Sequence, residues 1–229
     1  MAMLLYELAG SDDRRFSPYC WRTRMALAHK GIACDTRGVA FTAIPAILDG
    51  SRKTVPVLDD HGTVVSDSTV IADHLDRAYP ERPKLFRSAA ERGLATFINE
   101  WTAGTVHGGL IGFVVLDIHD CLAPPDQAYF RASREKRFGR RLEEVQQGRE
   151  ERVEAFRKSL APLRQTVSAQ AFLGGAEPCY ADYIVFGAFQ WVRVVSAFRP
   201  LAEDDPVLAW FRRCLDLHGG VARVPGGWS

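Results

Sequence analysis

The change in hydrophobic pattern near residue 80 is the feature that most constrains the fold of this chain. Before that point, short apolar runs of strand length alternate with amphipathic stretches of helical length. After it, the period of two that is typical of strands disappears and only helical periods continue. The sequence therefore predicts an α/β domain at residues 1–80 and an all-helical domain at residues 91–229. The Pro- and charge-rich residues 81–90 are expected to link them.

The α/β part predicts the element order βαβ-α-ββα. Residues 17–30 form the clearest helix, because Ser17 is a good N-cap, Pro18 suits the first helical position and Gly31 is a typical stop. In the second predicted helix, Val70, Ile71, His74, Leu75 and Ala78 are expected to share one face, and Pro80 stops it. The other expected elements are strands at 3–9, 33–41, 54–60 and 63–67 and a short Pro-interrupted helix at 42–50.

The helical part predicts elements of contrasting character. Residues 91–122 read as a long apolar helix, and the "PPDQ" at 124–127 breaks it. A charged amphipathic helix or helix pair is expected at 128–169, with the arginines between Arg131 and Lys158 forming a solvated face. A buried helix at 178–198 and an amphipathic one at 205–220 complete the chain.

Composition excludes several classes of partner. Lys and Arg number 29 against 28 Asp and Glu, so the net charge of +1 gives no reason to expect a nucleic-acid partner. The five cysteines form no Cys-x-x-Cys pair and fit a reducing compartment better than a disulfide framework. No signal peptide is recognisable, and the longest apolar run is shorter than the roughly 20 residues that cross a bilayer. The six scattered histidines do not suggest a metal site. We therefore expect a cytoplasmic protein without membrane or metal.

The stretch "FSPYCWRTRMALAHKG", residues 16–31, brings two nucleophile-type side chains to one helix start. Ser17 is expected to cap the helix, but its hydroxyl could also donate a hydrogen bond to an anionic sulfur held at the helix N-terminus. Cys20 could be a reactive thiol of lowered pKa, since thiols in a first helical turn are often activated. Its position three residues into the helix favours a buried, inert thiol instead.

Two further segments are candidates for ligand binding. Pro56 interrupts a strand-like run, so a cis Val55–Pro56 bond or an edge position is expected, and either would free the backbone of Val55. A simple edge strand is the plainer alternative. Asp67 and Ser68 open the next helix, where they could cap it or hold the ammonium and carboxylate of a small zwitterion.

These segments together resemble the cytosolic glutathione transferases. The matching stretches are "SPYCWRTRMALAHKG", "TVPVLDDHGTVVSDSTVIADHLDRAYP" and "PCYADYIVFGAFQW", which span both halves of the chain. The resemblance implies a thioredoxin-like domain followed by a helical domain, glutathione as the thiol substrate, a role in detoxification and a homodimer. The active-site motif is similar to those of the omega and zeta classes, with serine where the omega class has its catalytic cysteine.

Site residues follow from the resemblance position by position. Ser17, rather than Cys20, corresponds to the residue that activates the glutathione thiol. The family's cis-proline falls on Pro56, with Val55 pairing the cysteinyl backbone, and its γ-glutamyl pair falls on Asp67 and Ser68. Lys53 is a candidate for the glycine carboxylate of glutathione.

The acceptor site is less defined by the sequence. Gly104, Gly108 and Gly112 lie four apart on one helix face, which suggests either a closely packed helix or room for a flat aromatic substrate. Further candidates for this site are Tyr19, Trp101 and His107. The tail and the Trp-Arg-Thr-Arg helix most resemble the bacterial β-etherase and fungal etherase-like group, which implies a small hydrophobic electrophile, an aromatic compound or aryl ether. A Cys20-dependent thiol transferase and a non-catalytic ligand-binding protein are the alternatives.

Overall fold

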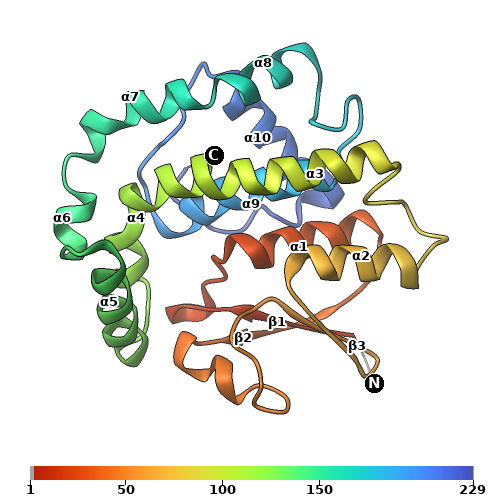
Figure 1. The fold of residues 1–229 in the computed structure, drawn as a ribbon, viewed down its shortest axis with the longest axis horizontal. Helices are drawn as coiled ribbons and strands as arrows, with labels where there is room; N and C mark the ends of the chain where they lie inside the picture. Colours follow the sequence, from red (N-terminus) through yellow and green to blue (C-terminus); the bar gives the residue numbers. More distant parts are fainter. Residues whose placement is uncertain (1–2, 229) are drawn as a thin grey trace.

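A four-stranded sheet and two helices form the N-terminal domain. The computed structural model describes residues 3–228. The strands are β1 (Leu4–Leu8), β2 (Asp35–Val39), β3 (Val57–Asp60) and β4 (Thr63–Ser66), arranged in the order β2-β1-β3-β4. β1 and β2 are parallel, whereas β3 is antiparallel to both β1 and β4. Helices α1 (Pro18–His29) and α2 (Ser68–Ala78) lie between the sheet and the helical domain (Figure 1), and the short helix η2 (Phe41–Ala46) follows β2. This thioredoxin-like arrangement confirms the predicted element order.

The second half contains only helices and helical turns within the described residues. They are α3 (Ala89–Trp101), α4 (Gly108–Asp120), α5 (Pro124–Phe138), α6 (Leu142–Gln146), α7 (Arg149–Ser159), α8 (Ala161–Ala169), α9 (Tyr180–Val195) and α10 (Pro206–Asp216). A π-helical turn, Thr102–His107, joins α3 to α4. The resulting Ala89–Asp120 segment is long and apolar enough to span a membrane by length and composition, a test that core helices also pass. Its residues Leu110, Phe113, Val114 and Ile118 are buried in the helical core.

The structure corrects three details of the sequence prediction. The charged residues 128–169 do not form one helix or a pair, because α5 already begins at Pro124 and three further short helices follow it. Val70 and Ala78 are exposed rather than part of the packed face of α2, which buries Ile71, Ala72 and Leu75. His74, expected on that packed face, forms a hydrogen bond with Asp60 (Nε2 to Oδ2, 2.6 Å).

Helix α9 fixes the position of α1 and hence of the functional residues at its start. Every residue of α9 is buried, and the helix packs along α1. At Gly187 the two helices meet so closely that a Cβ atom would lie 2.4 Å from the carbonyl oxygen of Pro18. A second link runs from the buried hydroxyl of Tyr180, which donates a 2.7 Å hydrogen bond to the carbonyl oxygen of Ser68. The helical domain thus supports both helix starts of the N-terminal domain.

Candidate active site

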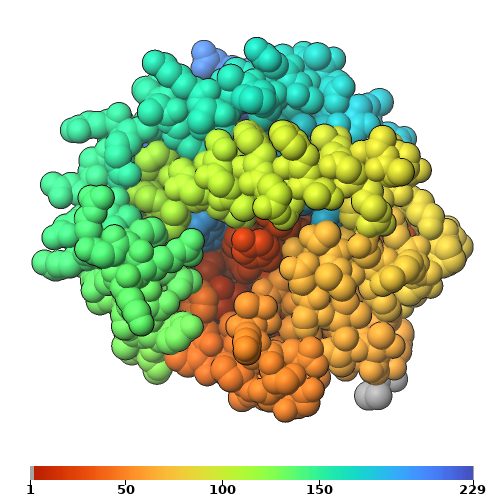
Figure 2. Space-filling view, viewed as in Figure 1, coloured from red at the N-terminus to blue at the C-terminus, as the bar shows by residue number. Residues whose placement is uncertain are grey.

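A cavity of about 740 Å³ lies between the two domains. Its floor comes from the N-terminal domain, including Ser17, Lys53 and Val55, and its walls come from the helices that follow residue 100. Figure 2 shows the hollow at the centre of the molecule, framed by the red and orange N-terminal residues, the yellow-green α3–α4 segment and the green α5. The size and mainly apolar lining suit a small organic ligand.

Ser17 is the N-cap of α1, as the sequence predicts. Its Oγ accepts a 3.3 Å hydrogen bond from the backbone N–H of Cys20, and Pro18 occupies the first helical position. The side chain is only 5% exposed, yet it borders the cavity. The hydroxyl also interacts with the Cys20 thiol; since its proton can rotate, an anion in the cavity can receive the hydrogen bond instead. Capping and ligand binding are therefore compatible functions of the same atom.

The environment of Cys20 opposes a nucleophilic role. The residue is 2% exposed and does not border the cavity. Burial, reinforced by the negative charge of Glu7, raises the pKa of its thiol to about 12. Reactive cysteines have the opposite character, an exposed thiol whose pKa is lowered. Within this structure Cys20 is a packing residue.

Lys53, Val55 and Pro56 lie at the entrance to β3. The Val55–Pro56 peptide bond is cis, and the strand begins only at Val57, so Val55 lies outside the ladder. Lys53 and Val55 border the cavity, whereas Pro56 does not. Within the described residues the Lys53 ammonium has no hydrogen bond or ion pair. A charged donor is therefore available beside the free backbone of Val55.

Asp67 and Ser68 lie at the same end of the β3–β4 hairpin as Pro56. The register pairs Val57 with Ser66, which places the residues flanking this pair next to each other. The exposed Asp67 has a φ of 76°, and its Oδ1 accepts hydrogen bonds from the N–H groups of Thr69 (2.8 Å) and Val70 (3.1 Å). The buried Ser68 begins α2. Neither residue borders the 740 Å³ cavity, so any ligand that reaches both must extend beyond it.

Only some of the predicted acceptor residues meet at the cavity. Tyr19, His107 and Gly108 border it; Trp101 and Gly104 do not. The helix-packing explanation of the glycine stripe fails at Gly104 and Gly108, where a Cβ atom would meet no other helix within 4 Å. Trp191 of α9, which the sequence analysis missed, completes an aromatic wall. The His107 ring contacts Tyr19 and Trp191 with centroid distances of 5.5 and 5.8 Å.

His107 is a neutral component of this wall at physiological pH. Burial is the main cause, and the charge of Arg22 adds to it, so that the pKa of His107 falls to about 3. Its buried Nε2 has no hydrogen-bond partner among the described residues. The ring therefore offers the cavity a neutral surface.

Three arginines near the cavity were not recognised from the sequence. Arg22 is buried; it donates from Nη1 to Asn99 (2.7 Å) and lies 4.6 Å from the centre of the Tyr19 ring. Its Nε and Nη2 have no partner among the described residues. Arg134 and Arg137 border the cavity; Arg134 is half-buried and departs from the expected solvated face, whereas Arg137 is exposed as expected. Their spacing from Phe130, four and seven residues, places all three on one side of α5, and this signal was present in the sequence.

The described residues contain no group of three or more His, Cys, Asp or Glu side chains that could hold a metal ion.

The fold and the site define a class: a thioredoxin-like domain whose first helix presents a serine to a cavity shared with a helical domain. Comparison with known families assigns the class. The N-terminal domain of glutathione S-transferases matches residues 13–83, and the C-terminal domain of the same proteins matches residues 93–210. The chain belongs to the glutathione S-transferase family.

Individual relatives agree with this assignment over nearly the whole chain. The glutathione transferase GSTFuA2 of Phanerochaete chrysosporium is 31% identical with a TM-score of 0.76, and the match covers 96% of this chain and 93% of that one. A glutathione S-transferase of Ceriporiopsis subvermispora, solved in complex with glutathione, has a TM-score of 0.80 at 24% identity, with both chains covered completely. Glutathione S-transferase omega-1 of Mus musculus is 25% identical over 199 residues, 86% of this chain and 72% of that protein.

Proposed function

We propose that this protein is a glutathione transferase that uses Ser17 to stabilise the glutathione thiolate, which then attacks an electrophilic aromatic compound. The observation that carries the proposal is the position of Ser17. Its hydroxyl caps α1 as an acceptor, keeps a proton to donate and borders the cavity. A sulfur anion placed there receives this hydrogen bond and the favourable field of the helix N-terminus.

Glutathione is assigned to the N-terminal side of the site. Val55 offers its free backbone groups to the cysteinyl part of the tripeptide, next to Pro56. Lys53 faces the glycine carboxylate, while Asp67 and Ser68 hold the γ-glutamyl ammonium and carboxylate. The bound glutathione in the Ceriporiopsis subvermispora neighbour supports this choice of ligand. The contribution of the protein is to lower the pKa of the thiol and to hold it beside the acceptor.

The acceptor is assigned to the helical side, against Tyr19, His107 and Gly108. In the reaction the thiolate sulfur forms a bond to the electrophilic carbon, and the leaving group departs with the electron pair of the bond that breaks. The thiol proton passes to solvent. An aryl ether fits this scheme, with an alkoxide or phenolate as leaving group, and an etherase-like activity is part of this proposal.

The two alternatives receive less support. A thiol transferase that depends on Cys20 would need an accessible thiolate, whereas this thiol is buried and its pKa is raised. A non-catalytic binding protein would need no proton donor at the start of α1, where Ser17 borders the cavity. A homodimer and a cytoplasmic location, both typical of the family, complete the proposal.

The decisive experiment is the pH–rate profile of Ser17→Ala with glutathione and an aryl halide. A thiol of pKa about 8.5 is only a few per cent ionised at pH 7, and lowering the pKa by about two units increases the thiolate about tenfold or more. We therefore expect Ser17→Ala to lose at least about tenfold in turnover at pH 7 and to recover partly in alkaline buffer.

Cys20→Ser is the matched control and should retain transferase activity. Loss of activity in Cys20→Ser, together with a mixed disulfide between wild-type protein and glutathione, would establish the thiol-transferase alternative. The removal of the cap is a separate effect that costs about 1 kcal/mol of folding free energy. A Ser17→Ala protein that is destabilised by this amount but keeps the wild-type pH profile would exclude Ser17 from the chemistry.

A further inference from the structure

The charges around the cavity are all of one sign. Among its lining residues three are cations, Lys53, Arg134 and Arg137, and none is an aspartate or glutamate. The histidine in the lining, His107, is neutral because burial and the charge of Arg22 lower its pKa to about 3. Lys53 is assigned to glutathione in the proposed function. The two arginines therefore remain without a role in binding the tripeptide.

Arg134 lies over two aromatic rings of the lining. Its guanidinium carbon lies 4.7 Å from the ring centre of Phe130 and 5.9 Å from that of Phe41. Nη1 donates a 3.0 Å hydrogen bond to the Oγ of Ser133, and no ion pair or other hydrogen bond of this guanidinium exists among the described residues. Cation–π contacts of this kind help to position a guanidinium, and its nitrogens without a partner can bind a planar anion.

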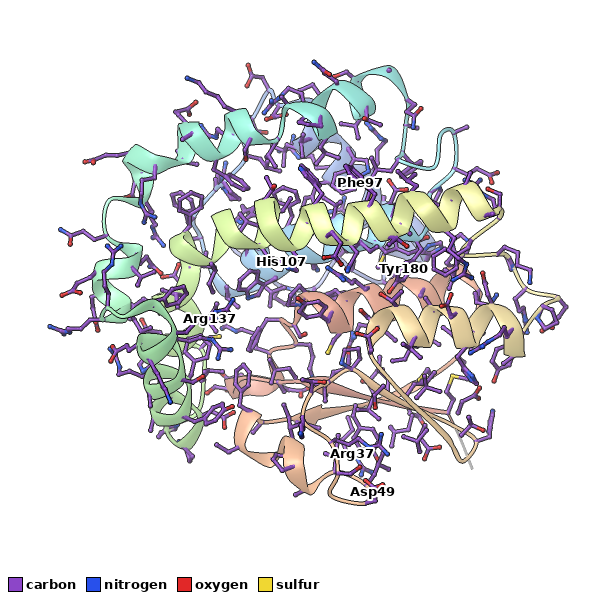
Figure 3. All side chains as sticks on the ribbon, viewed as in Figure 1. Arg37, Asp49, Phe97, His107, Arg137 and Tyr180 are labelled. Atoms are coloured by element: carbon purple, nitrogen blue, oxygen red, sulfur yellow. The ribbon has the colours of Figure 1, made fainter. Side chains whose placement is uncertain are left out.

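Arg137 lies one turn further along α5, where Figure 3 shows it on the side of the helix that faces the N-terminal domain. Within the described residues it has neither a hydrogen bond nor an ion pair. Other arginines of the same region behave differently. Arg131 pairs with Glu135 and Glu143, and Arg149 pairs with Asp117. Arg140 and Arg152 also lack a carboxylate partner among the described residues, but neither borders the cavity, so Arg134 and Arg137 are the unpaired arginines at its wall.

The carboxylate at the start of the same helix is already used. Asp126, at the start of α5, accepts hydrogen bonds from the N–H groups of Phe41 (2.7 Å) and Thr42 (2.9 Å) and from the Thr42 hydroxyl (2.7 Å). These bonds tie η2 to α5 and fix the wall that carries Phe41 and Phe130. They leave Asp126 buried and outside the lining. The wall is therefore held in place by Asp126, but the positive charges of Arg134 and Arg137 are not neutralised by it.

We propose that the acceptor substrate of this protein is an aromatic carboxylate, whose carboxylate group is bound by Arg134 and Arg137 and whose ring packs against the aromatic wall. This inference rests on the proposed function and adds the substrate class. The two cations without a counter-charge favour an anionic group, and the apolar cavity beside them favours an apolar body. A ligand that combines both fits this site better than a neutral hydrocarbon does. A guanidinium binds a planar carboxylate through two parallel hydrogen bonds.

A matched pair of acceptors tests the proposal: 4-chloro-3-nitrobenzoate and the neutral 4-chloro-3-nitrobenzamide. In both, the glutathione sulfur forms a bond to the carbon that carries chlorine, chloride leaves with the bonding electrons, and the thiol proton goes to solvent. Since the two acceptors differ in intrinsic reactivity, each variant is compared with wild type on the same acceptor. We expect Arg134→Gln and Arg137→Gln each to lower kcat/KM for the benzoate by about tenfold or more, and to leave the benzamide within about twofold.

Lys136→Gln is the matched control, since it removes the same charge from the neighbouring position of α5 but does not border the cavity. It should leave both acceptors unchanged. Added salt should raise the wild-type KM for the benzoate and leave the KM for the benzamide unchanged. An equal loss on both acceptors, or a benzoate loss as large in Lys136→Gln, would overturn the proposal. A rise in the KM for glutathione in the arginine variants would instead assign the pair to the tripeptide and would also overturn it.

Binding of 3-nitrobenzoate and 3-nitrobenzamide, which carry no leaving group, separates this inference from the proposed function. Calorimetry in the presence of S-methylglutathione should show tighter binding of the benzoate, lost in the double variant Arg134→Gln, Arg137→Gln. If wild-type protein binds the benzoate in this way but turns over neither chlorinated acceptor, the proposed function fails while the anion site stands. Equal binding of both compounds by wild type would remove the anion site.

Discussion

The two sides of the candidate site, of which the cavity is only a part, are built in different ways. The N-terminal side (Ser17, Lys53, Val55, Pro56, Asp67 and Ser68) consists of short-range features, namely two helix caps and the entrance to a strand. The helical side (His107, Gly108, Arg134, Arg137 and Trp191) is assembled from α5, α9 and the junction of α3 with α4. The N-terminal side can therefore be predicted from local sequence, whereas the helical side depends on long-range packing.

The strongest test of this contrast is the contact between the two domains at Gly187. If the N-terminal side were determined locally, Gly187→Ala in α9 would leave it intact. The structure predicts otherwise, because the new Cβ would lie 2.4 Å from the oxygen and 3.3 Å from the carbon of the Pro18 carbonyl, next to Ser17. We expect a loss of about 1–3 kcal/mol in folding free energy and a clear fall in turnover, measured by urea unfolding and steady-state kinetics.

Gly93→Ala is the matched control in α3. Nothing lies within 4 Å of a Cβ built at Gly93, so alanine should be neutral or stabilise by up to about 1 kcal/mol through its higher helix propensity. If Gly187→Ala behaves like Gly93→Ala in both stability and turnover, the close approach of α9 to α1 is not needed for the site.

The sequence predicted the fold and the local geometry at the starts of α1 and α2 for the same reason. Helix caps, prolines and strand periods act over a few residues, so Ser17, Pro18 and Asp67 could each be placed from their neighbours. The Cys20 thiol shows the limit of that reasoning. Its inert character depends on burial and on the charge of Glu7 from another element. Local sequence favoured that outcome without excluding the reactive one.

The helical side was predicted less well because helix faces acquire partners only through tertiary packing. Gly108 and His107 border the cavity as expected, but Trp101 and Gly104 do not, although they share the same helical segment. Arg134 and Arg137 were taken as part of a solvated face. A run of arginines looks alike whether its members pair with glutamates, as Arg131 does, or face a cavity. The arginines that pair with glutamates are distinguished from those that face the cavity only by the packing of η2 against α5.

A smaller effect is expected at the second cap of the N-terminal side. Asp67→Asn should raise the KM for glutathione about tenfold and change turnover at saturation little, because the proposed contact is with the ammonium, far from the sulfur. Asparagine is as good an N-cap as aspartate and tolerates the positive φ of 76°, so stability should stay within about 0.5 kcal/mol. Asp67→Ala should show the same rise in KM and an added loss of about 1 kcal/mol. An unchanged KM in both variants would remove Asp67 from the glutathione site.

The smallest predicted effect belongs to His107 on the helical side, and it appears only in acid. Burial first, and the Arg22 charge second, lower its pKa to about 3, against about 6.5 in an unfolded chain. Between these values the unfolded state binds a proton that the folded state does not, so His107 adds a decrease in folding stability as the pH falls below about 6.5. The contribution is at most about 1.4 kcal/mol per pH unit, reduced by the partial exposure of the ring.

His107→Gln should remove this part of the pH dependence. The groups that face the ring are Arg22 and Tyr19 of α1 and Trp191 of α9, and all three are unchanged in the variant. The acid sensitivity of His29 and His218, whose pKa values are also lowered by burial, is common to both proteins and cancels in the comparison. Urea unfolding at pH 7, 6 and 5 should therefore show the wild-type advantage over His107→Gln shrinking as the pH falls. Parallel curves would mean that the ring is hydrated enough to titrate normally, and the wall it forms with Tyr19 and Trp191 would then be open to water.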